Sequence, residues 1–159
     1  METQTKILKS GLQVVYIPRP GTKLLNMGVY IAAGSMYEEG GKFPLGTAHF
    51  LEHMVFNGTQ KYPDQDSVRG IITSDGGNEG AATSATHQFY DVATLSDYTE
   101  QALEYLSQLT LHPLLREEHI ENEREIILSE FERNESNPIK RFMIKGLGPA
   151  LYENEALGN

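Results

Sequence analysis

Residues 45–56 (LGTAHFLEHMVF) place three ionisable side chains inside a stretch that is otherwise mostly apolar. At 100° per residue of an α-helix, Glu52 falls about 60° to one side of His49 and His53 about 40° to the other. The three groups therefore share one narrow face of a helix. Burying them without partners would cost several kcal/mol. A metal ion is the simplest partner for such a set.

The chain has no cysteine, so neither a disulfide nor a thiolate metal site can form. Any metal must be held by imidazole nitrogens and carboxylate oxygens. Two histidines four positions apart also occur by chance on helices, but the intervening Glu52 and the apolar surroundings favour a metal site. A structural metal site, or a buried ion network without hydrolysis, stays open at this point.

Composition indicates a soluble globular protein of one ordinary domain. The chain has 159 residues, of which 39% are hydrophobic and 22% charged, which is enough for a core. Its net charge of −9 argues against a nucleic-acid partner. No run approaches the roughly 20 apolar residues that span a bilayer, and the start METQTKILKSGLQVV has no signal-peptide pattern. We expect a cytoplasmic protein with no membrane partner.

Hydrophobic periodicity and turn residues predict an α+β fold. Helices are expected over residues 47–57, 64–73, 97–111, 113–135 and 139–152, with a glycine-rich loop over 34–46. Strands are expected over residues 12–17, 24–33, 81–86 and 89–95. Because the strands come in antiparallel-looking pairs with helices between them, we expect a mostly antiparallel sheet with helices packed on one face.

The helix expected from Pro113 carries two misplaced carboxylates. Glu123 lies in the middle of the apolar stripe, and Glu130 lies at about −20° from it on the helical wheel. A carboxylate on a buried stripe needs a cation or several hydrogen bonds. The residues that define this stripe are Leu115, Ile120, Ile126, Ile127 and Phe131.

Other interpretations of these glutamates stay open from the residues alone. Glu123 and Glu130 could be partly exposed near the sheet edge, or could pair with Arg124 or Arg141. His119 lies on the same stripe and is a rival ligand. The helical wheel does not say which carboxylate would bind a metal.

His49-Phe-Leu-Glu-His53 has the His-x-x-Glu-His spacing of the reversed zinc-protease signature. Together with AAGSMYEEGG before it and AHFLEHMVFNGT around it, the chain closely resembles the pitrilysin/insulinase family, which includes the mitochondrial processing peptidases. The resemblance covers nearly the whole chain. It implies the fold of that family's metallopeptidase domain.

The resemblance also implies a set of roles. His49, His53 and Glu130 would hold one Zn²⁺, and Glu123 would be a catalytic-site residue that supports the ligands. Glu52 would act as general base on a water molecule held at the metal, so that the protein would be a zinc-dependent endopeptidase. Its substrate would be a peptide or an unfolded polypeptide.

Substrate binding in this family resembles β-augmentation, in which a peptide adds to an edge strand that usually reads Asn-Ala-x-Thr-Ser. Gly80 replaces the usual Asn, whose contact would be lost unless Asn78 takes its place, and Gln88 stands where Thr is common. The residues expected to bind substrate are Gly80, Ala81, Ala82 and Thr83.

Family members enclose substrate between homologous halves, each built from two related domains. The resemblance therefore predicts that residues 1–159 form a single metallopeptidase-like domain that is C-terminally incomplete, with a second homologous domain or subunit as partner. The alternative function is a non-catalytic or partner-dependent subunit of the same fold. Such a subunit would bind a peptide or a partner chain without cleaving alone.

Overall fold

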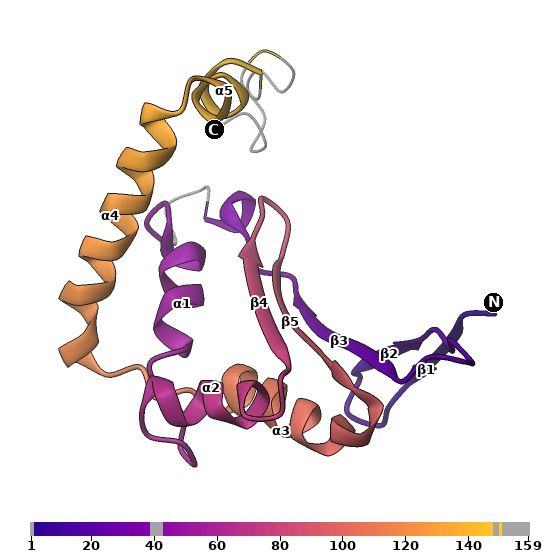
Figure 1. Cartoon of the computed structure of the whole chain (residues 1–159). Helices are drawn as coiled ribbons and strands as arrows, with labels where there is room; N and C mark the ends of the chain where they lie inside the picture. Colours follow the sequence, from indigo (N-terminus) through magenta and orange to yellow (C-terminus); the bar gives the residue numbers. More distant parts are fainter. Residues whose placement is uncertain (1, 39–42, 148–149, 151–159) are drawn as a thin grey trace.

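The computed structural model describes residues 2–38, 43–147 and 150, and it shows the expected α+β fold (Figure 1). All strand pairs are antiparallel: β1 with β2 in a hairpin, and β3, β5 and β4 in that order in a three-stranded sheet. The strands are β1 (Gln4–Ile7), β2 (Gln13–Tyr16), β3 (Leu24–Ile31), β4 (Asn78–Thr83) and β5 (Gln88–Leu95).

Two helices lie between β3 and β4 in the sequence, and three follow β5. They are α1 (Thr47–Val55), α2 (Gln65–Thr73), α3 (Thr99–Leu111), α4 (Ile120–Ser136) and α5 (Pro138–Phe142). Short 3₁₀ turns cover Ser35–Tyr37, Ser96–Tyr98 and Glu117–His119, and a π-helical turn covers Met143–Leu147. No helix in the described part of the chain is long and apolar enough to cross a bilayer.

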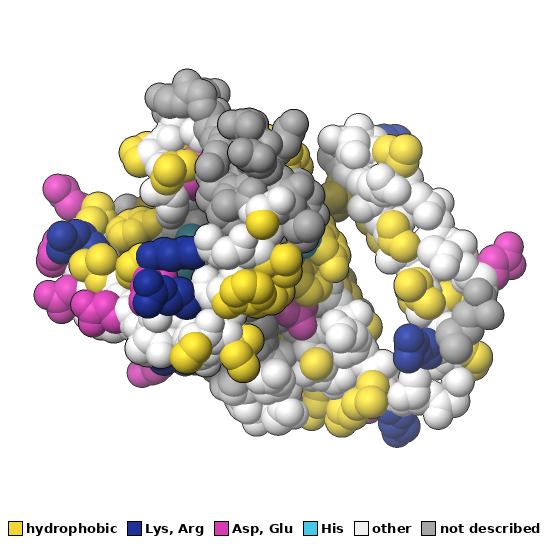
Figure 2. All heavy atoms as spheres, turned by 90° about the horizontal axis from the view of Figure 1, so that it is seen from above, with side chains coloured by type: hydrophobic (Ala, Val, Ile, Leu, Met, Phe, Trp, Pro, Cys, Tyr) yellow, Lys and Arg dark blue, Asp and Glu magenta, His cyan; other side chains and the backbone are white. Residues whose placement is uncertain are grey.

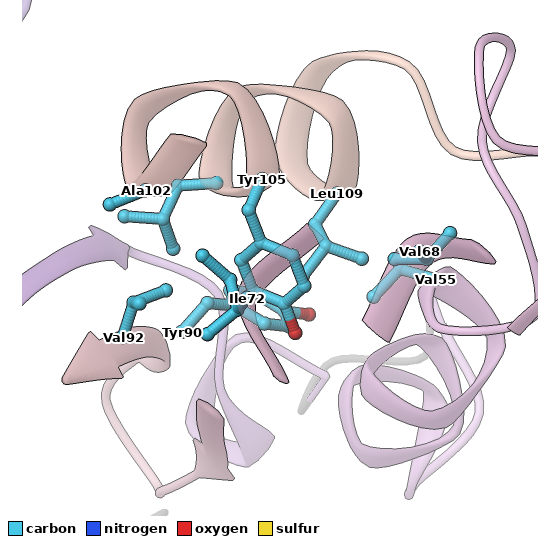
Figure 3. Packing of buried hydrophobic residues seen from close by; sticks show 9 residues of the cluster. Val55, Val68, Ile72, Tyr90, Val92, Ala102, Tyr105 and Leu109 are labelled. Carbon is cyan, nitrogen blue, oxygen red and sulfur yellow. The ribbon is translucent and has the colours of Figure 1, made fainter. Parts of the chain in front are cut away.

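The core lies between one face of the three-stranded sheet and helices α1, α2 and α3 (Figure 3). Side chains alternate along β5, so Tyr90 and Val92 face the helices and are almost fully buried. Partners in the register lie on the same face: Met27 is opposite Val92, and Ala81 is opposite Tyr90. The buried cluster comprises Val55, Val68, Ile72, Tyr90, Val92, Ala102, Tyr105, Leu106 and Leu109.

Two predicted boundaries were wrong. The strand expected over 81–86 runs from Asn78 to Thr83, because the Ser84 hydroxyl accepts from the backbone N–H of Thr86 and His87 and so builds the turn. The helix expected from Pro113 begins only at Ile120 after a 3₁₀ turn, because Pro113 bridges Thr59 in extended conformation. The last helix, expected over 139–152, is α5 followed by the π-helical turn; its end lies outside the described residues.

The apolar stripe of α4 is mostly exposed, contrary to the prediction. Glu123 is the buried residue of this helix, whereas Leu115, Ile120, Ile126 and Phe131 are exposed and Ile127 is half-buried. The reason is that α4 stands off the sheet and packs against α1 and α5 (Figure 1). The part of the chain that the structure describes provides no other layer to cover the stripe.

The hairpin of β1 and β2 projects from the body of the molecule and carries apolar side chains on its surface (Figure 2). An isolated two-stranded hairpin is marginally stable in water, and a large apolar surface on such a hairpin indicates a contact that it would make elsewhere. Its exposed apolar residues are Ile7, Leu8, Leu12, Val14, Val15, Tyr16 and Ile17.

Candidate metal centre

Helix α1 is fixed at its N-terminus by a carboxylate from the preceding loop. Glu38 is only 5% exposed, and its two oxygens accept hydrogen bonds from the backbone N–H of Gly46 at 2.7 Å and of Ala48 at 2.6 Å. The N-cap residue is Gly46, which has no side chain to do this and adopts φ +88°. An anion at a helix N-terminus also interacts favourably with the helix dipole.

We expect Glu38→Ala to lower the free energy of unfolding by about 2 kcal/mol, because two N–H groups would lose a charged acceptor in a buried place. Urea unfolding followed by circular dichroism measures this. Glu125→Ala, which removes an exposed carboxylate from α4, is the matched control and should change stability by less than about 0.5 kcal/mol. Equal effects of both variants would contradict the role of Glu38.

Two strand residues hold α1 in place along its length. The amide of Gln88, which is fully buried on β5, donates from Nε2 to the carbonyl of Ala48 at 2.5 Å. The hydroxyl of Thr83 at the end of β4 donates to Oε2 of Glu52 at 2.5 Å. The carboxylate of Glu52 is therefore oriented by the strand beside the helix.

His49 and His53 of α1 meet Glu130 of α4 at the point where the two helices pack together. The Nε2 atoms of both histidines lie 3.7 Å from Oε2 of Glu130. One ligand atom from each residue lies within 4.8 Å of the other two. Two atoms bound tetrahedrally to one zinc ion at its usual bond lengths are about 3.4 Å apart. The three donors therefore fit a zinc ion with small adjustments of the side chains.

Glu123 orients His53 rather than meeting Glu130. Its Oε2 lies 3.2 Å from Nδ1 of His53, and its Oε1 accepts from the Asn57 amide at 2.9 Å. Glu123 is 6% exposed, so these hydrogen bonds supply the partners that its buried carboxylate needs. A carboxylate that accepts from Nδ1–H leaves the Nε2 lone pair of His53 free for a metal.

The rival interpretations from the sequence differ from the observed contacts. Arg124 donates to Glu121, and the guanidinium of Arg133 lies 3.8 Å from Oε1 of Glu130. His119 lies outside the group of possible ligands found among the described residues, with its Nε2 3.8 Å from Oε1 of Glu118. Arg141 makes no ion pair with either glutamate in that part of the chain.

The residues expected to bind substrate all lie on β4, an edge of the three-stranded sheet. The N–H of Ser84 donates to the carbonyl of His87 on the β5 side. Because backbone groups alternate in direction along a strand, those of Ala81 and Thr83 point to the free edge. The members of this set are Gly80, Ala81, Ala82 and Thr83, and β5 is the strand that pairs with them among the described residues.

Sequence reasoning missed the supporting role of three residues. Glu38 and Gln88 hydrogen-bond to the backbone of α1, and Asn57 donates to the carboxylate of Glu123. The available signal was an acidic loop before a helix that lacks a side-chain cap. The buried hydroxyl of Tyr90 has no hydrogen-bond partner among the described residues. Burial, and then the negative charge of Glu52, raises the pKa of Tyr90.

Comparison with known proteins matches both the fold and the sequence. Two solved structures superpose with TM-scores of 0.82 and 0.79: an inactive domain of peptidase M16 from Pseudomonas fluorescens and a protease from Helicobacter pylori. The first is 20% identical over 100% of this chain and 38% of its own, which shows the fold alone. The second is 29% identical over 89% of this chain and 33% of its own.

The chain is 34% identical over 157 residues to the beta subunit of the mitochondrial-processing peptidase of Dictyostelium discoideum. This match covers 99% of the chain and 33% of that protein, so the chain spans about a third of the length of such relatives. The family model for insulinase (peptidase family M16) matches residues 13–159. The resemblance inferred from the sequence is thus confirmed, and the chain belongs to the insulinase family of peptidases.

Proposed function

We propose that this chain is the metal-binding part of a zinc-dependent endopeptidase. The observation that carries the proposal is the convergence of His49, His53 and Glu130 from two helices that lie far apart in the sequence. Chance pairing of surface histidines and carboxylates does not account for Glu123, which is buried and bonded to the remaining ring nitrogen of His53.

His49, His53 and Glu130 would hold one Zn²⁺, and Glu123 would keep His53 in the tautomer that binds through Nε2. When bound, the metal would supply Lewis acidity toward the scissile carbonyl and the attacking water. Glu52 would accept a proton from that water at its carboxylate and later donate it to the leaving amine. Thr83 would orient the Glu52 carboxylate for both steps through the hydrogen bond to Oε2.

A substrate peptide would add to the free edge of β4, where the backbone groups of Ala81 and Thr83 are available. Glu52 hydrogen-bonds to Thr83 at the end of this strand, so a peptide on this edge would pass beside the general base. Backbone pairing gives affinity for extended segments of many sequences. The substrate class is therefore a peptide or an unfolded polypeptide.

A second homologous domain or subunit would complete the protein. The support for this is the apolar surface of the β1–β2 hairpin and of α4, together with a chain that spans about a third of its curated relatives. A partner-dependent subunit that binds peptide without cleaving alone is the second candidate. We also retain a cytoplasmic location as a prediction, whereas the Dictyostelium relative is named as a mitochondrial enzyme.

Removal of the metal tests the proposed function. We expect the chain, purified without chelator, to cleave an unstructured peptide, to lose this activity after dialysis against a chelator, and to regain it when one equivalent of Zn²⁺ is added. Mass spectrometry of the products measures cleavage. Zinc binding without any cleavage would favour the partner-dependent subunit, and cleavage that resists the chelator would overturn the zinc mechanism.

A further inference from the structure

An acidic side chain lies beside the peptide-binding edge on the sheet face opposite the core. Asp91 of β5 pairs with Gly28 of β3 on one side and with Gly80 of β4 on the other. Directly opposed residues of neighbouring strands point to the same face of a sheet. Asp91 is therefore flanked on its own face by two residues without side chains.

The two glycines leave different amounts of room. A Cβ built on Gly28 would lie 2.3 Å from the ring of Phe89, so this aromatic ring already fills the space beside Gly28. A Cβ built on Gly80 would lie 2.4 Å from Oδ1 of Asp91. The carboxylate of Asp91 therefore extends over Gly80, toward the free edge of β4.

Asp91 has a carboxylate that is available to a ligand. Its side chain is half-buried, and among the residues that the structure describes it makes no hydrogen bond and no ion pair. The acidic residue next to the glycine, Glu79, points to the other face, where it accepts from Arg69 and Tyr105. A half-buried carboxylate without a partner is stabilised by a cationic group that arrives with a ligand.

A peptide on the edge of β4 would bring one side chain to this carboxylate. The peptide residue opposite Gly80 would point to the same face as Asp91, with its Cβ about 5 Å from the Gly80 position. Because Gly80 has no side chain, nothing on β4 separates that peptide residue from Oδ1 of Asp91. A lysine or arginine side chain spans this distance, and the net charge of −9 also attracts basic peptides.

We propose that Asp91 selects peptides that place a lysine or arginine opposite Gly80 on the edge of β4. This inference rests on the proposed function, since it assigns a substrate preference to the same edge strand. Gly80 is the residue that permits the contact, and Asp91 is the residue that determines specificity. The asparagine expected at position 80 in this family would close the opening over which the carboxylate lies.

Peptide binding to the zinc-loaded Glu52→Gln variant of the full chain tests the proposal independently of cleavage. The probes are labelled nine-residue peptides that carry one lysine or one norleucine at each position in turn, and the dissociation constant is measured by fluorescence anisotropy. We expect the lysine peptide to bind about fivefold more tightly than its norleucine partner at one position, the size of a single partly solvated ion pair. Added salt should reduce this ratio.

Two further variants assign the preference to the proposed residues. Asp91→Asn, made in the same Glu52→Gln background, should bring the lysine-to-norleucine ratio close to one. Asp91→Lys should reverse the preference, so that the norleucine peptide binds more tightly than the lysine peptide. Gly80→Asn should also bring the ratio close to one, because the introduced side chain would displace the carboxylate of Asp91. This variant tests the proposal if the Asp91 variants fail to fold. Asp97→Asn removes an exposed charge just beyond β5 and should leave the ratio unchanged.

Three results would overturn the specificity role of Asp91. They are a ratio of one at every position, a ratio that survives Asp91→Asn, and the absence of binding by any peptide. Cleavage of peptides by the wild-type chain with no preference for lysine would leave the proposed function standing and remove only this inference. Tight binding of lysine peptides without cleavage by the wild type would leave the specificity role of Asp91 standing and contradict the proposed peptidase function.

Discussion

Glu52→Gln is expected to lower the rate of peptide cleavage about a thousandfold, because general acid–base catalysis contributes factors of this order. The amide of glutamine has nearly the same shape as the carboxylate, and its oxygen can still accept from the hydroxyl of Thr83. It cannot take a proton from water at neutral pH. The variant should therefore bind peptide and zinc as the wild type does, and lose only the chemical step.

The initial rate of cleavage of one fluorogenic peptide, measured at equal zinc content, checks this result. Glu125→Gln changes an exposed glutamate of α4 and is the matched control, for which the rate should stay within twofold. A Glu52→Gln rate within tenfold of the wild type would mean that another group serves as the base. A parallel loss of zinc would instead assign Glu52 to the ligands.

His53→Ala should reduce the zinc content from about one ion per chain to less than a tenth, since only His49 and Glu130 would remain as ligands.

Glu123→Ala should keep all three ligands but weaken zinc binding about tenfold to a hundredfold, because His53 would lose the partner of its Nδ1. Metal analysis after dialysis against a graded zinc buffer separates these two effects.

His119→Ala is the control for the metal experiment. This histidine lies near the start of α4 but outside the group of ligand atoms, so its removal should leave the zinc content unchanged. Full zinc retention by His53→Ala would refute the three-residue site. Loss of zinc from His119→Ala would restore the rival ligand set that the sequence left open.

The fold was predictable where local patterns decide it. Exposed and half-buried residues alternate along β3, and Asp64 and Ser67 form a capping box at the start of α2. Both are local signals, and both elements form close to their predicted positions. The predicted start of the helix at Pro113 was wrong because Pro113 pairs with Thr59, a contact between residues far apart in the sequence. The predicted burial of the apolar stripe of α4 was wrong because burial depends on whether another layer covers the helix.

The candidate site was predictable to a similar extent. A period of 3.6 residues alone puts His49, Glu52 and His53 on one helix face, and the wheel correctly marked Glu123 as buried. The wheel could not separate the roles of Glu123 and Glu130, because both lie on nearly the same face of α4. Only the crossing of α1 and α4 brings one carboxylate to Nδ1 of His53 and the other to the Nε2 atoms.

The sequence by itself determined the chemistry that is available to this protein: imidazole and carboxylate groups at helical spacing, and no thiolate. The tertiary structure decided which groups meet, since Glu38, Gln88 and Thr83 reach α1 from loops and strands outside that helix. It also decided that Asp91 reaches over Gly80. Local spacing fixes the face on which a side chain lies, whereas packing between distant segments fixes its neighbours.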